Sequence, residues 1–490
     1  MVREERMKVE GTGSRGEKAR ESLLLFLEES TIAVEYHPII LEYLNHIFML
    51  ENSNLINGSG DSLHANDATS FNILTRTLRV SKKRTLRGIL RLILFAIALI
   101  LASCLPQVKR KHSNTILLFG FQKELLGSED KILSLVKNLS TKIPNLFDDA
   151  TQVLFESRES AISSFLFSKS ATAPVLALRV MREHFSIISR WKIVLSVFKM
   201  VLKTIRRNFS VFFIAPERIF LEFPIWRIII PQMNLKAITT QSKLELLPAL
   251  FYVQEKNRSM VWYSNNSLPF KKRGEETRIP LVASNAGFID HHFVWSESHR
   301  EFLKFRYPKS EISVVGPITF ETSSNRTFHQ PISKVILYFD VTPFDNLEYE
   351  TFYTTEICIN AIKDLTEAAA NFGMPLHLKP KRPYLLGQKG KLQHSGNYVK
   401  LLYKLESEKL LKLLDARVGI ENEIRASQLV IGLPFTSPVL ISSHLERPSF
   451  YYVPSNAGEW ELPPERDGIV VVQGKIRLND YLKSLISEEN

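Results

Sequence analysis

The chain has 490 residues and is 44% hydrophobic, which is long and apolar enough for two globular cores. Lys and Arg number 63 against 51 Asp and Glu, and the net charge of +12 favours anionic partners such as phosphate groups and lipid headgroups. The only cysteines, Cys104 and Cys358, are far apart in the sequence. This excludes a disulfide framework and a zinc ribbon, and fits a reducing cytosol.

The first 111 residues are expected to be an extension that precedes the folded domains. Residues 1–20 are almost continuously polar and charged, unlike a secretory signal, so we expect a protein that is not exported. The most apolar segment of the chain, residues 92–105, has basic residues on both sides. It is short for a helix that crosses a bilayer, which needs about 20 apolar residues. Two interpretations stay open: a helix or re-entrant hairpin at an anionic membrane surface, and a buried core helix.

Residues 112–322 are expected to form a first α/β domain. Strand-like apolar runs at 116–119, 211–214, 236–240 and 261–264 alternate with helical patterns. This alternation is typical of a parallel sheet with helices packed on its faces.

A basic amphipathic helix is predicted within this domain. From Ile187 to Ile205, apolar residues that include Trp191 fall at helical spacing on one face, while Lys and Arg occupy the rest. Such a helix suits a membrane interface, but it also suits the surface of its own domain, with its lysines in solvent.

Residues 323–490 are expected to form a second α/β domain, which begins after a polar linker at 323–330. Strands and helices alternate through this region, which predicts a doubly wound sheet. The expected strands are 334–339, 376–378, 429–432, 450–453 and 469–472; the expected helices are 356–371, 398–414, one from about 437 and one at the C-terminus.

Two strand-to-helix turns of the second domain are candidates for an anion site, because ligands of such sheets bind beyond the carboxyl ends of the strands. The first turn is Lys379, Pro380, Lys381 and Arg382. Its prolines stiffen the backbone, and three cations on a stiff turn can hold a diphosphate without a metal.

The second turn is Pro434, Phe435, Thr436 and Ser437, between the strand LVIG and an apolar helix. Thr436 and Ser437 are at the position that caps a helix, where backbone N–H groups and hydroxyls can bind an anion. The hydroxyls can serve as caps or as phosphate ligands. Two such turns on one sheet favour a binding site.

Residues 421–454, ENEIRASQLVIGLPFTSPVLISSHLERPSFYYVP, resemble the bacterial polysaccharide-biosynthesis proteins named for their Pro-Phe-Thr-Ser (PFTS) motif. The stretch LKPKR at 378–382 is similar to the basic strand end of that family, and the resemblance extends from 234 to 482. It implies a GT-B glycosyltransferase, in which two Rossmann-like domains face each other across a cleft.

More distantly, the two turns are similar to those of bacterial sialyl and Kdo transferases. That resemblance implies a cytidine monophosphate sugar as the donor, bound without a metal and without any other cofactor. Those enzymes use a His-Pro pair where this chain has Lys379-Pro380, so the nucleotide stays open.

A transfer that inverts the sugar needs a base, usually Asp, Glu or His. The candidates are Asp290, His292 and Glu297, in a cluster around a strand expected at 293–295 that also holds His291 and His299, and spacing singles out none of them. A metal site at His291 and His292 is disfavoured, because adjacent residues of a strand point to opposite faces.

The function expected from the sequence is transfer of a sugar from a nucleotide donor to a surface polysaccharide or a lipid-linked glycan, on the cytoplasmic face of a bacterial inner membrane. One alternative is transfer of a polyol phosphate from a cytidine diphosphate donor, as in teichoic-acid synthesis. Another is a non-catalytic adaptor that binds a glycan or lipid carrier. Nucleic acid is disfavoured as a partner, because no basic stripe alternates with stacking aromatic residues.

Overall fold

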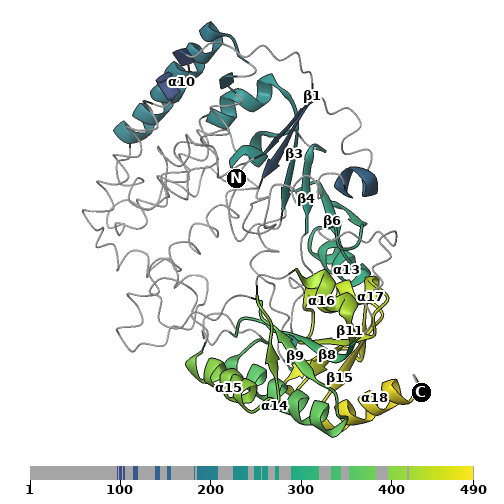
Figure 1. Cartoon of the computed structure of the whole chain (residues 1–490). Helices are drawn as coiled ribbons and strands as arrows, with labels where there is room; N and C mark the ends of the chain where they lie inside the picture. Colours follow the sequence, from purple (N-terminus) through teal and green to yellow (C-terminus); the bar gives the residue numbers. More distant parts are fainter. Residues whose placement is uncertain are drawn as a thin grey trace, which may run out of the picture. The chain divides into compact units, whose positions relative to one another are not determined.

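The fold is taken from a computed structural model, drawn in Figure 1. The residues that it describes are 97, 99–101, 103–104, 114–119, 138–143, 152–155, 181–182, 185–207, 225–240, 248–254, 256–262, 271–274, 289–318, 333–343, 352–381, 395–416 and 419–488. Arg382, the strand expected at 211–214, the linker expected at 323–330 and most of the extension 1–111 lie outside them.

The chain divides into two compact units. The first comprises residues 1–136, 143–261 and 284–292, and the second comprises residues 137–142, 262–283 and 293–490. In the expected domains 112–322 and 323–490, residues 137–142, 262–283 and 293–322 belong to the first domain, whereas here they group with the C-terminal part.

A six-stranded sheet has the strand order β2-β1-β3-β4-β6-β7. Strands β1 to β4 pair in parallel, as the sequence predicts for an α/β fold. The strands are β1 Asn114–Phe119, β2 Gln152–Phe155, β3 Asn234–Thr240, β4 Arg258–Val261, β6 His291–Val294 and β7 Glu311–Val314.

Strand β4 begins before the predicted strand at 261–264, and its first residue is a buried arginine. An ion pair with Asp290 compensates the charge of Arg258, so this residue can enter a buried strand. The 3₁₀ helices η4 Ile230–Gln232 and η5 Pro248–Tyr252 flank β3 in the chain.

The predicted amphipathic helix is confirmed as α10, Ile187–Arg207. Within the apolar segment predicted at 92–105, residues 97, 99–101 and 103–104 are helical. Among the residues with described positions, no helix has both the length and the apolar character that a membrane crossing requires.

The C-terminal sheet has seven strands in the order β10-β9-β8-β11-β12-β15-β14. All neighbours pair in parallel except the edge strand β14, which is antiparallel to β15. The doubly wound sheet predicted for this region is confirmed. Its strands are β8 Ser333–Phe339, β9 Leu376–Lys379, β10 Lys412–Leu413, β11 Ser427–Gly432, β12 Ser449–Val453, β14 Glu465–Arg466 and β15 Ile469–Gln473.

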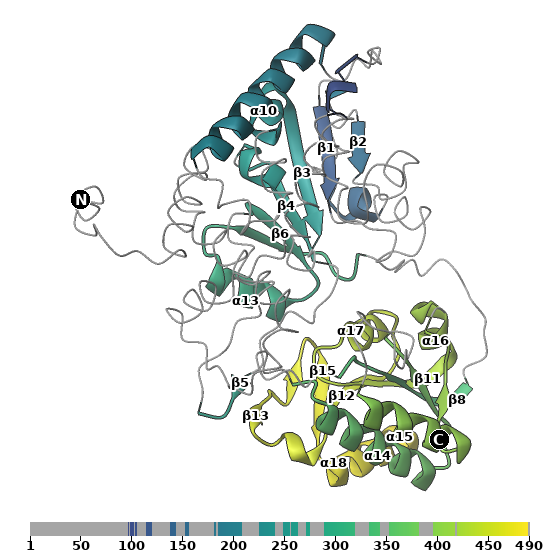
Figure 2. The same ribbon diagram turned by 90° about the vertical axis from the view of Figure 1, so that its left-hand side faces the viewer.

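Helices cover both faces of this sheet, as Figure 2 shows. One face carries α14 Thr355–Asn371, α15 Gly396–Ser407 and α18 Lys475–Glu488, which contact one another through α14. The other face carries α16 Ile420–Ala426, which the sequence analysis missed, and α17 Ser437–His444. A two-stranded antiparallel ribbon joins β5 Lys271–Lys272 to β13 Trp460–Glu461, and the short helix η6 Ser455–Ala457 precedes β13.

The helix predicted at 398–414 is too long: α15 ends at Ser407, and β10 follows. Lys409 adopts a left-handed conformation, with φ of 58°. Its N–H donates to the carbonyl of Glu406, and the N–H of Leu410 donates to the carbonyl of Leu405. This pair of bonds is a Schellman motif, which usually has Gly where this chain has Lys409.

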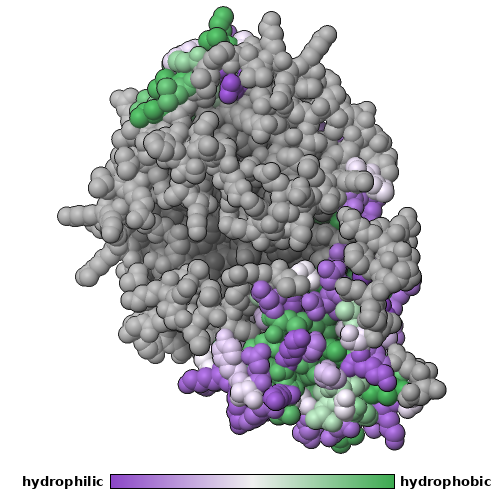
Figure 3. Space-filling model, viewed as in Figure 1, coloured by the Kyte–Doolittle hydropathy of each residue, from purple (hydrophilic) through white to green (hydrophobic). Residues whose placement is uncertain are grey.

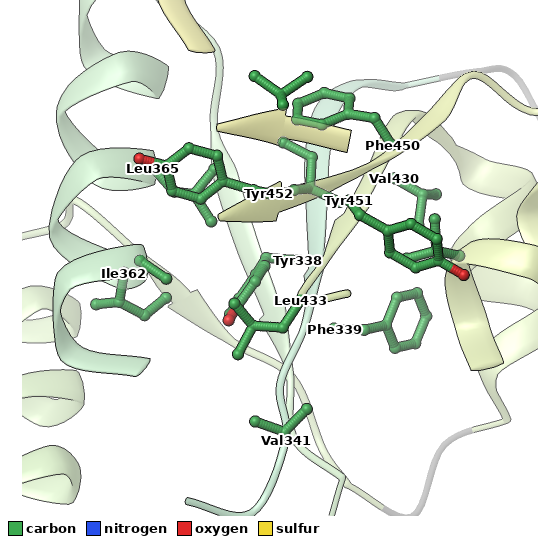
Figure 4. Packing of buried hydrophobic residues seen from close by; sticks show 14 of the residues in the cluster. Tyr338, Phe339, Val341, Ile362, Leu365, Val430, Leu433, Phe450, Tyr451 and Tyr452 are labelled. Carbon is green, nitrogen blue, oxygen red and sulfur yellow. The ribbon is translucent and has the colours of Figure 1, made fainter. Parts of the chain in front are cut away.

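The core of the C-terminal sheet is aromatic on both faces (Figure 4). Tyr452 points toward α14, where its hydroxyl donates to Asp364 Oδ2 over 2.7 Å. Its neighbour Tyr451 points to the opposite face, because side chains alternate along a strand. Both faces of the strands are thus buried, as expected for a parallel sheet between two helical layers.

Candidate functional site

The PFTS turn lies at the topological switch point of the C-terminal sheet. Strands β8 and β11 are adjacent at the centre of the sheet. The chain leaves β8 toward α14 on one face and leaves β11 toward α17 on the other. In open α/β sheets this divergence forms the crevice in which ligands bind. The turn after β11, which holds the motif, is therefore at the position that the fold makes available for a ligand.

The turn is tightly closed by its own hydrogen bonds. The backbone N–H and the side-chain Oγ1 of Thr436 both donate to the carbonyl of Leu433, over 3.2 and 2.8 Å. The hydroxyl of Tyr353 donates to the carbonyl of Pro434 over 2.7 Å. Thr436 is at the N-cap position of α17, as predicted, but its side chain makes no capping bond. Its hydroxyl is used inside the turn.

Phe435 anchors the turn in the core. Its backbone φ is 63°, the left-handed region that a non-glycine residue rarely adopts, and its ring is buried. The ring meets Tyr451 edge to face, with ring centroids 6.1 Å apart. The guanidinium of Arg466 lies over the ring, 4.3 Å from its centroid. A cation is thereby held beside the motif.

Arg466 comes from the β14–β15 hairpin, which the sequence analysis missed. Asp467 and Gly468 form its two-residue turn, both with positive φ, at 54° and 74°. The dipeptide Asp-Gly between short apolar runs is the sequence signal for such a hairpin. Burial lowers the pKa of Arg466, while Asp467 opposes that effect. Asp467 Oδ1 also accepts a bond of 3.0 Å from the backbone N–H of Ser298, in the first turn of α13, Glu297–Arg306.

A carboxylate that the sequence analysis also missed follows β8, the strand next to β11. Asp340 is buried, and its Oδ1 accepts a bond of 2.6 Å from the hydroxyl of Tyr398. The carboxyl ends of these two adjacent strands are therefore followed by a hydrogen-bonded acid after β8 and by the PFTS turn after β11.

Ser437 is the more accessible hydroxyl of the motif. It is half-buried at the start of α17, while Thr436 is buried. Pro434 and Phe435 are also buried, so their contribution is to shape the turn. An anion that approached the amino end of α17 would meet Ser437, whereas Pro438 after it has no backbone N–H and the N–H of Val439 donates to the carbonyl of Thr436 over 3.3 Å.

The basic turn after β9 is divided between buried and exposed residues. Lys379 is buried, and its Nζ donates to the carbonyl of Asp415 over 2.7 Å. Burial lowers the pKa of Lys379, against the opposing effects of Glu423 and Asp415. Pro380 is buried, and Lys381 is exposed. Of the cations predicted to bind the donor, Lys381 is thus the one that the structure describes as exposed.

The two predicted turns share the carboxyl edge of the sheet, but they are not adjacent. Strand β8 lies between β9 and β11. Asp340, directly after β8, donates its N–H to the carbonyl of Lys379 over 3.0 Å. The structure therefore brings both turns to one edge and inserts Asp340 between them.

Asp290, the first candidate base, is held by Arg258. The guanidinium donates from Nε to Asp290 Oδ2 over 2.8 Å and from Nη2 to Oδ1 over 2.9 Å. A forked pair of this kind fixes the carboxylate in place.

His292, the second candidate, is fully buried. Desolvation lowers its pKa to about 3, with His291 adding to the effect and Asp290 opposing it. The ring is therefore neutral at pH 7 and away from solvent.

Glu297, the third candidate, is exposed at the first position of α13 and pairs with Arg300 one turn later. Ser296 caps this helix by accepting a bond from the N–H of His299. Because Ser298 of the same turn binds Asp467, Glu297 is connected through the β14–β15 hairpin to the PFTS turn.

Among the residues that the structure describes, no three side chains of His, Cys, Asp or Glu gather at a position suited to a metal ion.

Comparisons with known proteins identify one family. Residues 240–482, about half of the chain, match the model of the polysaccharide biosynthesis PFTS motif proteins. No curated protein matches the chain.

Several solved structures share a low overall similarity with the chain. A UDP-GlcNAc 2-epimerase from Methanocaldococcus jannaschii is 10% identical, with a TM-score of 0.39, over 76% of this chain and 92% of that one. The wall teichoic acid polymerase TagF is 10% identical, with a TM-score of 0.38, over 83% and 88%. A UDP-forming trehalose-phosphate synthase from Burkholderia vietnamiensis is 9% identical, with a TM-score of 0.34, over 78% and 92%.

The matched residues contain the whole C-terminal sheet and the PFTS turn at its switch point, so the chain belongs to the family of polysaccharide biosynthesis PFTS motif proteins.

Proposed function

We propose that this protein is a glycosyltransferase that binds the phosphate of a nucleotide-activated sugar at the PFTS turn. The observation that carries the proposal is the position of this turn at the switch point, with Ser437 at the start of α17 and Arg466 stacked on Phe435. A hydroxyl at a helix start and a nearby guanidinium are groups that bind phosphate in proteins.

The acceptor in this proposal is a surface polysaccharide or a lipid-linked glycan, in keeping with the description of the family. The acceptor hydroxyl attacks the anomeric carbon of the sugar, the bond from that carbon to the phosphate oxygen breaks, and the nucleotide leaves with its phosphate. Groups that stabilise the charge developing on the leaving phosphate lower the barrier. Transfer without a metal, a cytidine nucleotide and a GT-B arrangement of two facing domains belong to the proposal.

Glu297 is the proposed base of an inverting transfer. Its carboxylate is exposed, whereas Asp290 is held by Arg258 and His292 is fully buried. Glu297 also stands on the helix that the β14–β15 hairpin connects to the PFTS turn. The variant Glu297→Gln removes the base, so its turnover rate should be roughly 10²–10⁴-fold lower, while donor binding is retained.

Thermal unfolding with a panel of nucleotides tests donor binding. The panel holds cytidine, uridine and guanosine mono- and diphosphates and CDP-glycerol, each with and without EDTA. A ligand at about a hundredfold its dissociation constant stabilises the native state by about 2.7 kcal/mol, which a melting curve resolves. Preference for CDP-glycerol over CMP and CDP would favour the polyol-phosphate alternative.

Matched variants locate the binding. Ser437→Ala and Lys381→Ala are expected to weaken the effective nucleotide roughly tenfold, the cost of one hydrogen bond to a charged group. Their controls are Ser443→Ala on the exposed part of the same helix and Lys400→Ala on α15. If the nucleotide raises the melting temperature of all four variants equally, it binds elsewhere. If no nucleotide raises the melting temperature of the native protein, the adaptor alternative is favoured.

A further inference from the structure

Helix α10 buries one side and exposes a row of apolar residues on the other. Its buried residues Arg190, Ile193, Val194 and Val197 follow a helical spacing of three and four. Arg190 is fully buried, and its Nε donates to the carbonyl of Phe185 over 3.0 Å. Three aliphatic side chains thus bury the inner side of the helix, and the bond of Arg190 to Phe185, just before the helix, satisfies the buried guanidinium locally.

The outer side carries large apolar residues. Ile188 is 72% exposed, Leu195 is 65% exposed and Leu202 is 62% exposed, with the partly exposed Trp191 between the first two. They succeed one another at intervals of three, four and seven residues, so they form a single row along the helix. Figure 3 shows this row as a strongly hydrophobic strip over α10. A continuous apolar row of this kind marks an interaction surface, whereas scattered exposed residues do not.

Cations accompany the row at a constant spacing. Lys192 follows Ile188 by four residues, Lys199 follows Leu195 by four, and both lysines are exposed. Residues four apart on a helix are neighbours, so each lysine lies beside an apolar residue of the row. The sequence repeats the spacing once more, with Arg206 four residues after Leu202.

The same unit carries a second set of exposed apolar residues. Ile97, Ile100 and Leu101 are exposed in the helical segment at 97–104. The segment belongs to the same unit as α10 and adds apolar surface to that unit.

We propose that the outer face of α10 docks this protein on an anionic lipid bilayer. The apolar row would enter the boundary between headgroups and acyl chains, with the lysines at the level of the headgroups, as in helices that lie in a membrane interface. The charges on this face favour a membrane over a second copy of the chain. In a dimer through this face, Lys192 and Lys199 would lie against the same lysines of the other copy. Anionic headgroups complement them.

Vesicle co-sedimentation of the full chain tests the proposal. The native protein is expected to pellet with vesicles that contain phosphatidylglycerol and to stay in the supernatant with pure phosphatidylcholine. Leu195→Glu places a carboxylate in the apolar row and should weaken binding on the order of tenfold or more. The matched control, Ser196→Glu, adds the same charge to the next exposed residue, outside the row, and should retain most of the binding.

Lys199→Gln is expected to reduce binding about fivefold, the effect of one lysine near an anionic surface. Melting curves and the nucleotide titration on each variant test whether the fold and the donor site are intact. Loss of vesicle binding with unchanged nucleotide binding would separate this proposal from the proposed function. Equal binding of Leu195→Glu and Ser196→Glu would overturn the proposal. The proposal would also fail if the native protein did not pellet with anionic vesicles, or if it formed a dimer that Leu195→Glu dissociates.

Discussion

Phe435 combines a left-handed backbone with a fully packed ring. The left-handed conformation costs a non-glycine residue about 1–2 kcal/mol, and contacts with Tyr451 and Arg466 offset that cost. Strain of this kind persists where the surroundings over-determine the backbone, as they do at binding sites.

Replacing Phe435 should therefore reverse the usual order of alanine and glycine. Both Phe435→Ala and Phe435→Gly lose the buried ring, a loss of about 3–5 kcal/mol. Only glycine removes the strain of the left-handed backbone, about 1–2 kcal/mol. This gain outweighs the entropic cost of glycine, which comes from its greater freedom in the unfolded chain and is about 0.4–1 kcal/mol. We expect Phe435→Gly to be as stable as Phe435→Ala or up to about 1 kcal/mol more stable, by urea denaturation. An alanine variant clearly more stable than the glycine variant would show that the backbone is unstrained.

At this scale the sequence predicted which residues form the turns but not what each side chain does. Lys379 is two residues before Lys381 and has the same chemistry, yet one is buried against Asp415 and the other is exposed. The direction of a side chain depends on strand pairing, which the composition of the turn does not contain. Arg466 was missed because its contact with Phe435 joins residues that are distant in the sequence.

Strand β11 and helix α17 meet at Gly432, where the fold requires the absence of a side chain. A Cβ there would lie 2.5 Å from Thr436 Oγ1 and 2.7 Å from Val439 Cγ2. Thr436 cannot yield easily, because its hydroxyl holds the turn closed on Leu433.

Gly432→Ala is accordingly expected to destabilise the protein by about 1–3 kcal/mol through overpacking. The control is Gly396→Ala at the first residue of α15, where a Cβ meets nothing within 4 Å. Alanine there should be neutral or stabilising by up to about 1 kcal/mol. Chemical denaturation of both variants compares the two sites, and equal stabilities would mean that the turn accommodates the added methyl group.

Elements with strong periodicity were predictable, and those with unusual ends were not. Strand β8 and helix α14 match their predicted ranges to within a residue, because apolar runs and caps are local signals. Helix α15 was predicted too long, because Lys409 forms the left-handed end that glycine normally provides. The alternation of strands and helices predicted the parallel pairing, but neither the order of the strands nor the antiparallel edge strand β14.

The whole molecule should lose stability as the pH falls below neutrality, and His292 contributes to that loss. Its pKa is about 3 in the fold, because the ring is desolvated, against roughly 6.5 in an unfolded chain. The unfolded state therefore binds more protons between these values, and stability decreases as the pH falls through this window.

The contribution of His292 is isolated by comparison with His292→Gln. The stability of the native protein relative to the variant should fall by up to about 1.4 kcal/mol per pH unit below about pH 6.5. Urea denaturation of both proteins across this range measures the difference. A constant difference would show that His292 keeps its ordinary pKa in the fold.

At this scale the sequence predicted two α/β regions, and both sheets confirm that part. The amphipathic helix was also predicted, but the sequence left open which way its apolar side faces. Both sides of α10 carry apolar residues. Arg190 would be expected in solvent because it is charged, yet it lies on the buried side of the helix.

The β14–β15 hairpin has a consequence for how the protein folds. It joins Asp467 to Ser298, which is 169 residues earlier in the chain, and places Arg466 beside a motif that closes on itself within four residues. Contacts of such separation form slowly, because a long loop must close before they are made. The PFTS turn can thus take its shape early, while the guanidinium beside it arrives only when the last strands are synthesised and docked. The proposed binding site is therefore complete at the end of folding, not at its beginning.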